Sequence, residues 1–212
     1  MSFCTLCLAA LFLSMLSAPA DELAPFRVAL EKQAKHRTVS VSIRQTKRIP
    51  ALSEAVVESG HLWLEPGKAF RWQIGNPVVR TAMFNGSKVH ILDELQKTGI
   101  EMDVDDRRAK PLLLMLGFGE AASLEQMLKS FTVASTNQIG DQFAVSLRPK
   151  DRLRRVLKSM HLQINTRTSF VERIEWTQRD GTVVLTEFLP PVFNKPLPAE
   201  GFSINRAAYS WE

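Results

Sequence analysis

The sequence predicts a mainly β fold with helical cover (α+β), in which about eleven antiparallel strands form an incomplete barrel. Three observations predict it. Apolar and polar residues alternate in many short runs, turn-forming pairs separate these runs, and only two stretches have helical composition. A twisted sheet seldom stays flat beyond about ten strands, so we expect this one to curl. The 212 residues suit one domain with a sizeable core.

The first 20 residues are predicted to be a signal peptide. The run Phe3–Ala20 carries no charge and ends in small residues directly before Asp21, as a cleavage site does. Because no Lys or Arg lies near Met1, an uncleaved membrane anchor is the alternative. The run is short for a bilayer core, which needs roughly 20 apolar residues. Residues 1–20 would therefore be removed, and residues 21–212 would form the mature domain.

The cysteines and charges limit the chemistry of that domain. Cys4 and Cys7 both lie in the signal segment, so residues 21–212 contain no thiol for a disulfide, a metal or a nucleophile. The formal net charge of +5 survives processing, because the removed segment is uncharged. An exported protein rarely meets nucleic acid, so we expect no such partner. One denser basic patch is most simply an exposed turn or helix: Lys150, Arg152, Arg154, Arg155 and Lys158.

Residues Asp21–Arg37 are predicted to form the first helix, capped by Asp21 and with Pro25 near its start. Its apolar residues recur three or four positions apart. Strands follow, recognised by alternation and by β-branched and aromatic residues. The predicted strands are Thr38–Thr46, Ala55–Leu64, Ala69–Ile74, Val78–Phe84, Lys88–Asp93, Gly99–Val104, Phe131–Ser135, Gln142–Leu147, Val156–Asn165, Ser169–Gln178, Thr182–Leu189 and a short last one near Phe202–Asn205.

The clearest strand is Ala69–Ile74, in which Phe70, Trp72 and Ile74 share one side of the pleat. Tight turns flank it. Pro sets φ in the turn Glu65–Lys68, and Asn85-Gly86 tolerates the positive φ of a two-residue type I′ loop. The region is therefore predicted to be an antiparallel meander with one apolar and one polar face.

Residues 107–129 interrupt the strand pattern and are predicted to form two short helices. The first, Pro111–Phe118, is almost wholly apolar, so its exposure to water would be unfavourable. Gly117 and Gly119 would let this segment move, or they simply end a helix.

In order and spacing, these motifs resemble the LolA family of periplasmic lipoprotein carriers. The resemblance rests first on Gly60, Leu62-Trp63, Phe70, Trp72, Pro77 and Asn85-Gly86, and it continues through residues 41–52, 131–133, 140–150 and 170–186. It implies an unclosed half-barrel with helices across its mouth. It also implies an inner-membrane extractor that loads the protein and an outer-membrane receptor that unloads it. Together with the signal segment, we expect a periplasmic monomer without a cofactor. The chain departs from better-known members at Leu64–Gly67, where the Arg that bonds their lid is absent.

A cavity for acyl chains is the corresponding site prediction. Its wall would consist of Leu64, Phe70, Trp72, Ile74, Met83, Phe143, Val145, Met160, Leu162, Ile174 and Trp176, and its lid of Leu112, Leu113, Leu114, Met115 and Phe118. The alternative is that all of these residues are packed core, because periodic apolar positions are normally buried. Periodicity alone does not distinguish a filled core from a pocket.

Signatures of catalysis are absent from the sequence. It contains no G-x-S-x-G, H-E-x-x-H, P-loop or G-x-G-x-x-G motif, and Asp103, Asp105 and Asp106 lack the Gly and Glu of a calcium loop. We predict a carrier of lipidated protein or lipid that is not an enzyme and holds no metal. Two alternatives stay open: a lipid- or lipoprotein-sensing or scaffold protein on the same fold, and an accessory that holds substrate for an esterase or acyltransferase.

Overall fold

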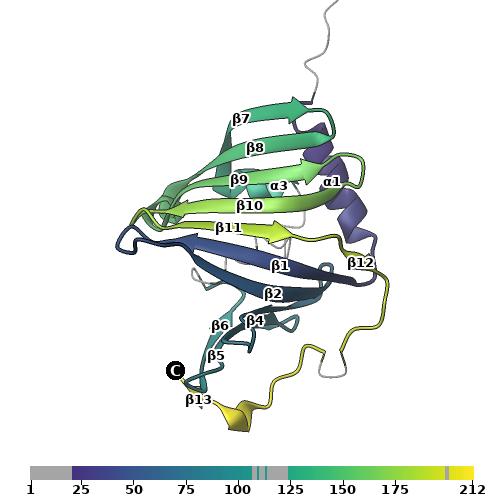
Figure 1. The fold of residues 1–212 in the computed structure, drawn as a ribbon. Coiled ribbons are helices and arrows are strands. Elements are labelled where there is room, and N and C mark those ends of the chain that lie inside the picture. The colour runs from purple at the N-terminus through teal and green to yellow at the C-terminus, as the bar shows by residue number, and fades with distance from the viewer. Residues whose placement is uncertain (1–20, 107–108, 110–112, 114–123, 199–200) are drawn as a thin grey trace, which may run out of the picture.

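A single open sheet dominates the computed structural model, which describes residues 21–106, 109, 113, 124–198 and 201–212 (Figure 1). Its strands are β1 (Val39–Arg48), β2 (Val56–Glu65), β3 (Ala69–Ile74), β4 (Arg80–Phe84), β5 (Lys88–Asp93), β6 (Thr98–Asp103), β7 (Phe131–Ile139), β8 (Gln142–Pro149), β9 (Leu157–Asn165), β10 (Phe170–Gln178), β11 (Val183–Phe188), β12 (Val192–Phe193) and β13 (Ser210–Trp211). Their order is β13-β6-β5-β4-β3-β2-β1-β11-β10-β9-β8-β7, with β12 paired to β1. The order is linear over the described residues, which confirms the incomplete barrel.

The sequence-based strand assignments hold for β1 to β11, whose pairs are all antiparallel. The short last strand near Phe202–Asn205 is wrong. That stretch has no strand structure, and the chain instead pairs later, where β13 runs parallel to β6. The two-residue strands β12 and β13 have too few residues to show alternation, so no periodicity predicts them.

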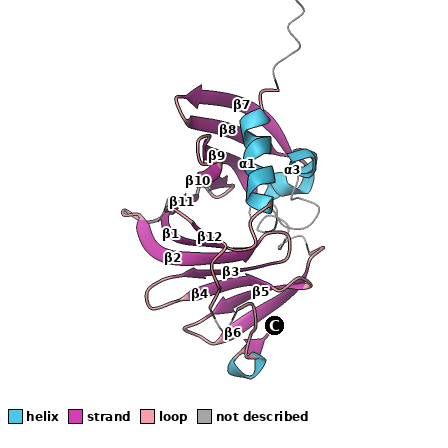
Figure 2. Cartoon of the chain, turned by 90° about the vertical axis from the view of Figure 1, so that its right-hand side faces the viewer, coloured by secondary structure: helices cyan, strands magenta, loops and turns pink. Residues whose placement is uncertain are grey.

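Two helices in the described part of the chain lie on one face of the sheet, behind the strands in Figure 1 and beside them in Figure 2. They are α1 (Ala24–Ala34) and α3 (Leu124–Ser130), and α3 is the second helix predicted for the inserted segment. Asp21 does not cap α1. The N-cap residue is Leu23, and Asp21 lies two residues earlier, where its Oδ1 accepts from the Leu23 N–H. Among the described residues, no helix has the length and apolar content needed to cross a bilayer.

The tight turns set the register of the meander. Gly67 has φ of 73°, and the Lys68 N–H donates to the Glu65 carbonyl, as in a turn with Pro and Gly at its centre. Gly86 has φ of 94°, but Asn85 does not share the positive φ that a type I′ loop needs. The Asn85 side chain instead accepts from the N–H groups of Ser87 and Lys88. The turn lies where it was predicted and has a different type.

The C-terminal segment 201–212 packs on the face of β3, β5 and β6 opposite the helices. Arg71 donates to the carbonyls of Gly201 and Ser203, and a Cβ built on Gly99 would lie 2.8 Å from the Trp211 ring. Burial, together with a hydrogen bond to Glu94, raises the pKa of Tyr209 to about 12. Segment 201–212, with the 3-10 helix η3 (Arg206–Ala208), thus covers part of the face opposite the helices, which we call the outer face.

Candidate functional site

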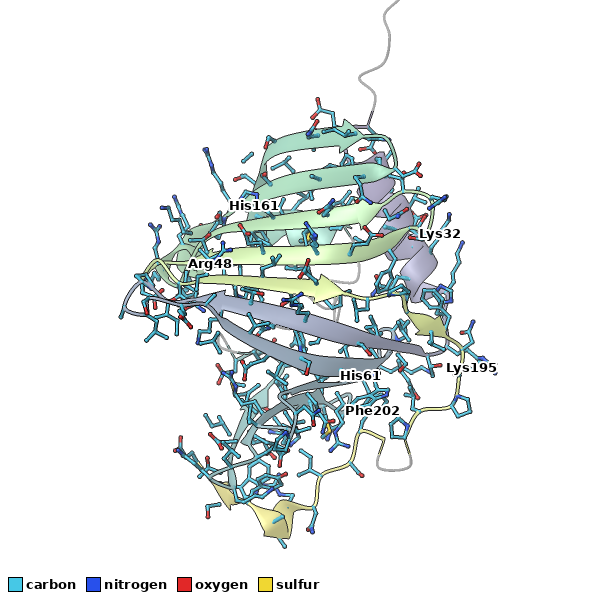
Figure 3. The ribbon with its side chains drawn as sticks, viewed as in Figure 1. Lys32, Arg48, His61, His161, Lys195 and Phe202 are labelled. Atoms are coloured by element: carbon cyan, nitrogen blue, oxygen red, sulfur yellow. The ribbon has the colours of Figure 1, made fainter. Side chains whose placement is uncertain are left out.

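We call the face of the sheet that carries α1 and α3 the inner face. On β1 and β2, residues of the inner face alternate with polar residues of the outer face. Val41 and Leu62 are buried on the inner face. On the outer face, the ring nitrogens of His61 share hydrogen bonds with the hydroxyls of Ser40 and Ser42 (Figure 3). Partial burial lowers the pKa of His61. The alternation predicted from sequence thus produces one apolar and one polar face.

The first apolar cluster lies on the inner face of β1 to β6. It contains four of the predicted wall residues, all buried: Leu64, Phe70, Trp72 and Ile74. Ala109 and Leu113, the two described residues of the stretch 107–123, pack into the same cluster. Of the predicted lid, Leu113 is therefore placed against the wall, while Leu112, Leu114, Met115 and Phe118 lie outside the described residues.

The second apolar cluster lies on β7 to β10 under α1 and α3. It brings together six more predicted wall residues: Phe143, Val145, Met160, Leu162, Ile174 and Trp176. Phe26 and Ala29 of α1 and Leu124 and Met127 of α3 pack on it and are buried. The amphipathic helices therefore shield this half of the sheet from water.

Met83 does not join either wall. Strand pairing sets Met83 opposite Arg71 and His90 and sets Phe84 opposite Phe70, so Met83 faces outward and Phe84 faces inward. Both side chains are buried, because segment 201–212 and the first cluster cover opposite faces here. The sequence of the loop before β4 does not reveal which residues of this strand face inward. The prediction therefore placed Met83 on the wall, whereas the adjacent Phe84 lies there.

One aromatic side chain joins the clusters. Phe188 of β11 packs against both, and its ring centroid lies 6.4 Å from that of Trp72 and 6.3 Å from that of Phe170. The Phe170 ring lies 6.1 Å from that of Phe193. These four aromatic rings form a continuous apolar row across the inner face, and sequence analysis missed Phe188, Phe170 and Phe193 as site residues because they fall at strand ends.

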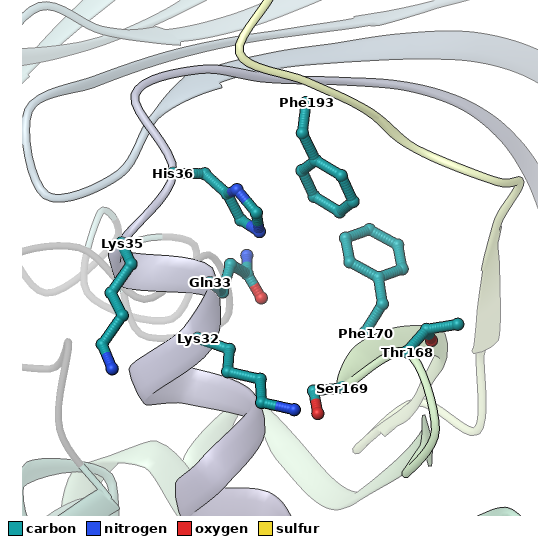
Figure 4. A pocket seen from close by; sticks show the side chains of 8 residues that line it. All are labelled: Lys32, Gln33, Lys35, His36, Thr168, Ser169, Phe170 and Phe193. Atoms are coloured by element: carbon teal, nitrogen blue, oxygen red, sulfur yellow. The ribbon is translucent and has the colours of Figure 1, made fainter.

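A first opening reaches this row beside the C-terminal end of α1 (Figure 4). This α1 opening has a volume of about 340 Å³ and is lined by Lys32, Gln33, Lys35, His36, Thr168, Ser169, Phe170 and Phe193. The His36 ring stacks on Phe193 with centroids 3.9 Å apart. Its floor is therefore aromatic, and its rim carries two ammonium groups.

A second opening lies at the other end of the β9–β10 hairpin, beside the 3-10 helix η2 (Asp151–Arg155). This η2 opening has a volume of about 370 Å³ and is lined by Leu153, Val156, Leu157, Met160, Trp176, Gln178, Arg179 and Asp180. The register pairs Gln178 with Leu157 at this end and Phe170 with Asn165 at the α1 end. The two openings therefore lie at opposite ends of the same strands.

Two indole N–H groups on the inner face lack a hydrogen-bond acceptor among the described residues. They belong to Trp72 and Trp176, and both nitrogens are inaccessible to water. A buried donor without a partner is unfavourable by about 1–3 kcal/mol, and a ligand with an acceptor oxygen would remove that penalty. Both tryptophans were predicted as wall residues, but their polar atoms were not part of the prediction.

The described residues include no cluster of three or more His, Cys, Asp or Glu side chains with the geometry of a metal site. The buried polar residues on the inner face are few. Thr186, which is 2% exposed, accepts from the Gln45 amide at 3.2 Å. The arrangement offers a long apolar surface with isolated donors, which suits binding of an apolar ligand.

Residues 34–205 match the family described as outer membrane lipoprotein carrier protein LolA. Among solved structures, an uncharacterized conserved protein from Thermus thermophilus has a TM-score of 0.52 at 9% identity, over 89% of this chain and 99% of the other. A LolA superfamily protein from Nitrosomonas europaea gives 0.44 at 11%, over 84% and 97%. The Pseudomonas aeruginosa MucA/MucB complex gives 0.46 at 10%, over 89% and 62%. No curated protein sequence matches.

Proposed function

The chain belongs to the LolA family of outer membrane lipoprotein carriers, and we propose on that basis that it binds acyl chains of lipoproteins or other lipids on its inner face and passes them towards the outer membrane. One observation carries the proposal. The two apolar clusters are continuous through Phe188, and an opening gives access at each end of the strands.

The cover of the inner face supports a role in transient binding. The sheet itself provides one wall, whereas α1, α3, Ala109 and Leu113 provide the other. The helices α1 and α3 contact the sheet through side chains such as Phe26 and Met127 and do not pair with its strands, so the cover is a separate layer (Figure 2). An acyl chain that enters between the layers replaces contacts of the cover and leaves the sheet paired.

The energetics of burial favour such an exchange. Burying one CH₂ group is worth roughly 0.8 kcal/mol, so two or three long chains in an empty cavity would exceed the ceiling of roughly −20 kcal/mol for non-covalent binding. Displacement of side chains that already fill the site, Leu113 among them, lowers the net affinity. A lower affinity lets the carrier give up its cargo to an acceptor that binds more tightly.

The proposal also assigns a compartment and partners. Residues 1–20 direct export, and residues 21–212 act in the periplasm between an inner-membrane extractor and an outer-membrane receptor. The cargo is a lipidated protein or a lipid, and the carrier is a monomer that catalyses no reaction. The family's carriers and the apolar inner face support this assignment.

Mass spectrometry of lipids that co-purify with residues 21–212, followed by transfer to acceptor vesicles, tests the proposal. We expect bound acyl lipid that leaves the protein when acceptor is added. Lipid that stays bound in the presence of acceptor would contradict the carrier role and favour the sensor or scaffold alternative. Conversion of the lipid to a product would favour an acyl-handling enzyme.

A further inference from the structure

The η2 opening has an apolar floor with Arg179 in its lining, and further positive charge lies on the adjacent η2 and its flanks. Residues 150–158 and 179–180 contain the basic residues Lys150, Arg152, Arg154, Arg155, Lys158 and Arg179 and only Asp151 and Asp180 as acids. Every residue of η2 except Leu153 is exposed to solvent. We propose that the η2 opening binds an anionic phospholipid, with the phosphate at this basic rim and the start of the acyl chain on the apolar floor. The inference rests on the proposed function and specifies the head group of its ligand.

Lys150 donates to the Leu128 carbonyl at 2.7 Å, whereas the arginines of η2 are available to a ligand. None of Arg152, Arg154 and Arg155 forms an ion pair within the described part of the chain, in contrast to Arg173, which pairs with Glu187 at 3.0 Å. Arg179 folds over η2, and its Nε donates to the Arg154 carbonyl. The carboxylate of Asp180 is engaged within its own turn, where it accepts from the Thr182 N–H. Guanidinium groups bind phosphate oxygens with paired hydrogen bonds, so this rim suits a phosphodiester.

A further cation, Lys47, lies on the inner face in the same row of residues as two that line the opening. Strand pairing places Lys47, Val184, Trp176 and Met160 side by side on the inner face. Lys47 is close enough to Asp180 to contribute to the low pKa of that carboxyl, which results mainly from the Thr182 backbone N–H. The end of the strands marked by Arg48 in Figure 3 therefore has a lysine on the inner face in addition to the arginines of η2.

The unpaired indole N–H of Trp176 completes the match. The indole nitrogen only donates, and an ester carbonyl between a phosphate head and an acyl chain is an acceptor. Leu157 and Met160 beside it are buried and apolar, while Val156 on the rim is 58% exposed. The exposed cations of η2, the buried indole donor and the apolar floor match the phosphate, the ester carbonyl and the acyl chain of a phospholipid.

The α1 opening provides an internal comparison. It also has basic residues on its rim, Lys32 and Lys35, but its floor is formed by the rings of Phe170 and Phe193, which have no donor (Figure 4). Lys32 lies at the opposite end of the strands from Arg48 (Figure 3). A double charge reversal at each opening therefore removes the same number of positive charges at two separate places.

The test measures calorimetric binding of a short-chain phosphatidylglycerol and of the phosphatidylcholine with the same chains, both as monomers, to residues 21–212. We expect the anionic lipid to bind more tightly. In Arg154→Glu/Arg155→Glu this preference should fall at least about tenfold, since a basic residue near an anionic lipid contributes roughly fivefold each. In the control Lys32→Glu/Lys35→Glu the preference should remain. Trp176→Phe should weaken both lipids equally, because the ester carbonyl is common to them.

Three outcomes would overturn the inference. They are equal affinity for the two lipids, an equal effect of both double variants, and binding of free glycerol phosphate, titrated in the same calorimeter, as strong as that of the anionic lipid. The last result would show an anion site without a role for the chain. Equal affinity for the two lipids leaves the proposed function intact, because acyl chains are still bound. Failure of both lipids to bind would overturn the proposed function as well.

Discussion

Truncation of Leu113 should have opposite effects on stability and on lipid affinity. Leu113 is 7% exposed and packs into the first cluster, where an acyl chain is proposed to lie. Leu113→Ala leaves a cavity and lowers the free energy of unfolding by about 2–5 kcal/mol. For a chain of this length we expect the melting temperature to fall by about 5–15 °C. If the cargo must displace the Leu113 side chain, its packing free energy opposes binding, and Leu113→Ala removes this opposition. Affinity should then rise by up to about a hundredfold, which corresponds to about 3 kcal/mol.

Leu92→Ala is the matched control for this prediction. Leu92 is 1% exposed, lies on the outer face opposite Thr81 and belongs to neither inner cluster. The same atoms are removed, so a similar loss of stability is expected without a change in affinity. Thermal unfolding and displacement of a fluorescent fatty acid measure both quantities. Affinity that stays constant or falls in Leu113→Ala would refute the reasoning that this side chain competes with cargo.

Three further predictions concern the outer face and the N-terminus. Burial lowers the pKa of His90, so the unfolded state binds a proton at this residue at a higher pH than the folded state does. Stability should therefore decline as the pH falls below about 6.5. In His90→Gln, the urea midpoint should depend less on pH in this range. Gly99→Ala should cost about 1–3 kcal/mol, because the new Cβ meets the Trp211 ring, and should cost less when combined with Trp211→Ala, as a double-mutant cycle of denaturant unfolding will show. The exported protein should begin at Asp21, and an intact mass that includes residues 1–20 would contradict cleavage.

Local signals were sufficient to predict most of the sheet. Alternation fixed which residues of β1, β2 and β3 face inward, and turn residues such as Gly67 placed the hairpins. Each of these features depends on neighbours within a few positions, so a single sequence contains the information. The count of about eleven strands agrees with β1 to β11, which are the strands longer than two residues in the described ranges.

Local signals could not predict which residues of β4 face inward or where the C-terminal segment pairs with the sheet. Met83 and Phe84 are adjacent and both apolar, and only the register with Phe70 decides which of them faces inward. The pairing of Trp211 with Gly99 joins residues more than a hundred positions apart. Such contacts depend on the assembled sheet, although the aromatic residues near the C-terminus signal that this end is packed against something.

Sequence patterns identified candidate residues for the site but not the three-dimensional shape that these residues form. Ten of the eleven predicted wall residues lie on the inner face, but the openings form only where distant segments meet, as His36 does with Phe193. The unpaired nitrogens of Trp72 and Trp176 are likewise visible only once their surroundings are known. A hydrophobic pattern specifies burial and does not specify which polar atoms remain unpaired.

Site-specific reaction with a labelled acyl chain tests the central claim most directly, because residues 21–212 contain no natural cysteine. Val145 is 1% exposed on the inner face, and its neighbour Ala144 is exposed on the outer face. A fatty acid with a thiol-reactive group at its end should modify Val145→Cys and spare Ala144→Cys, while a water-soluble reagent should show the reverse preference. Modification of Ala144→Cys alone by both reagents would contradict the proposal that acyl chains lie against the inner face.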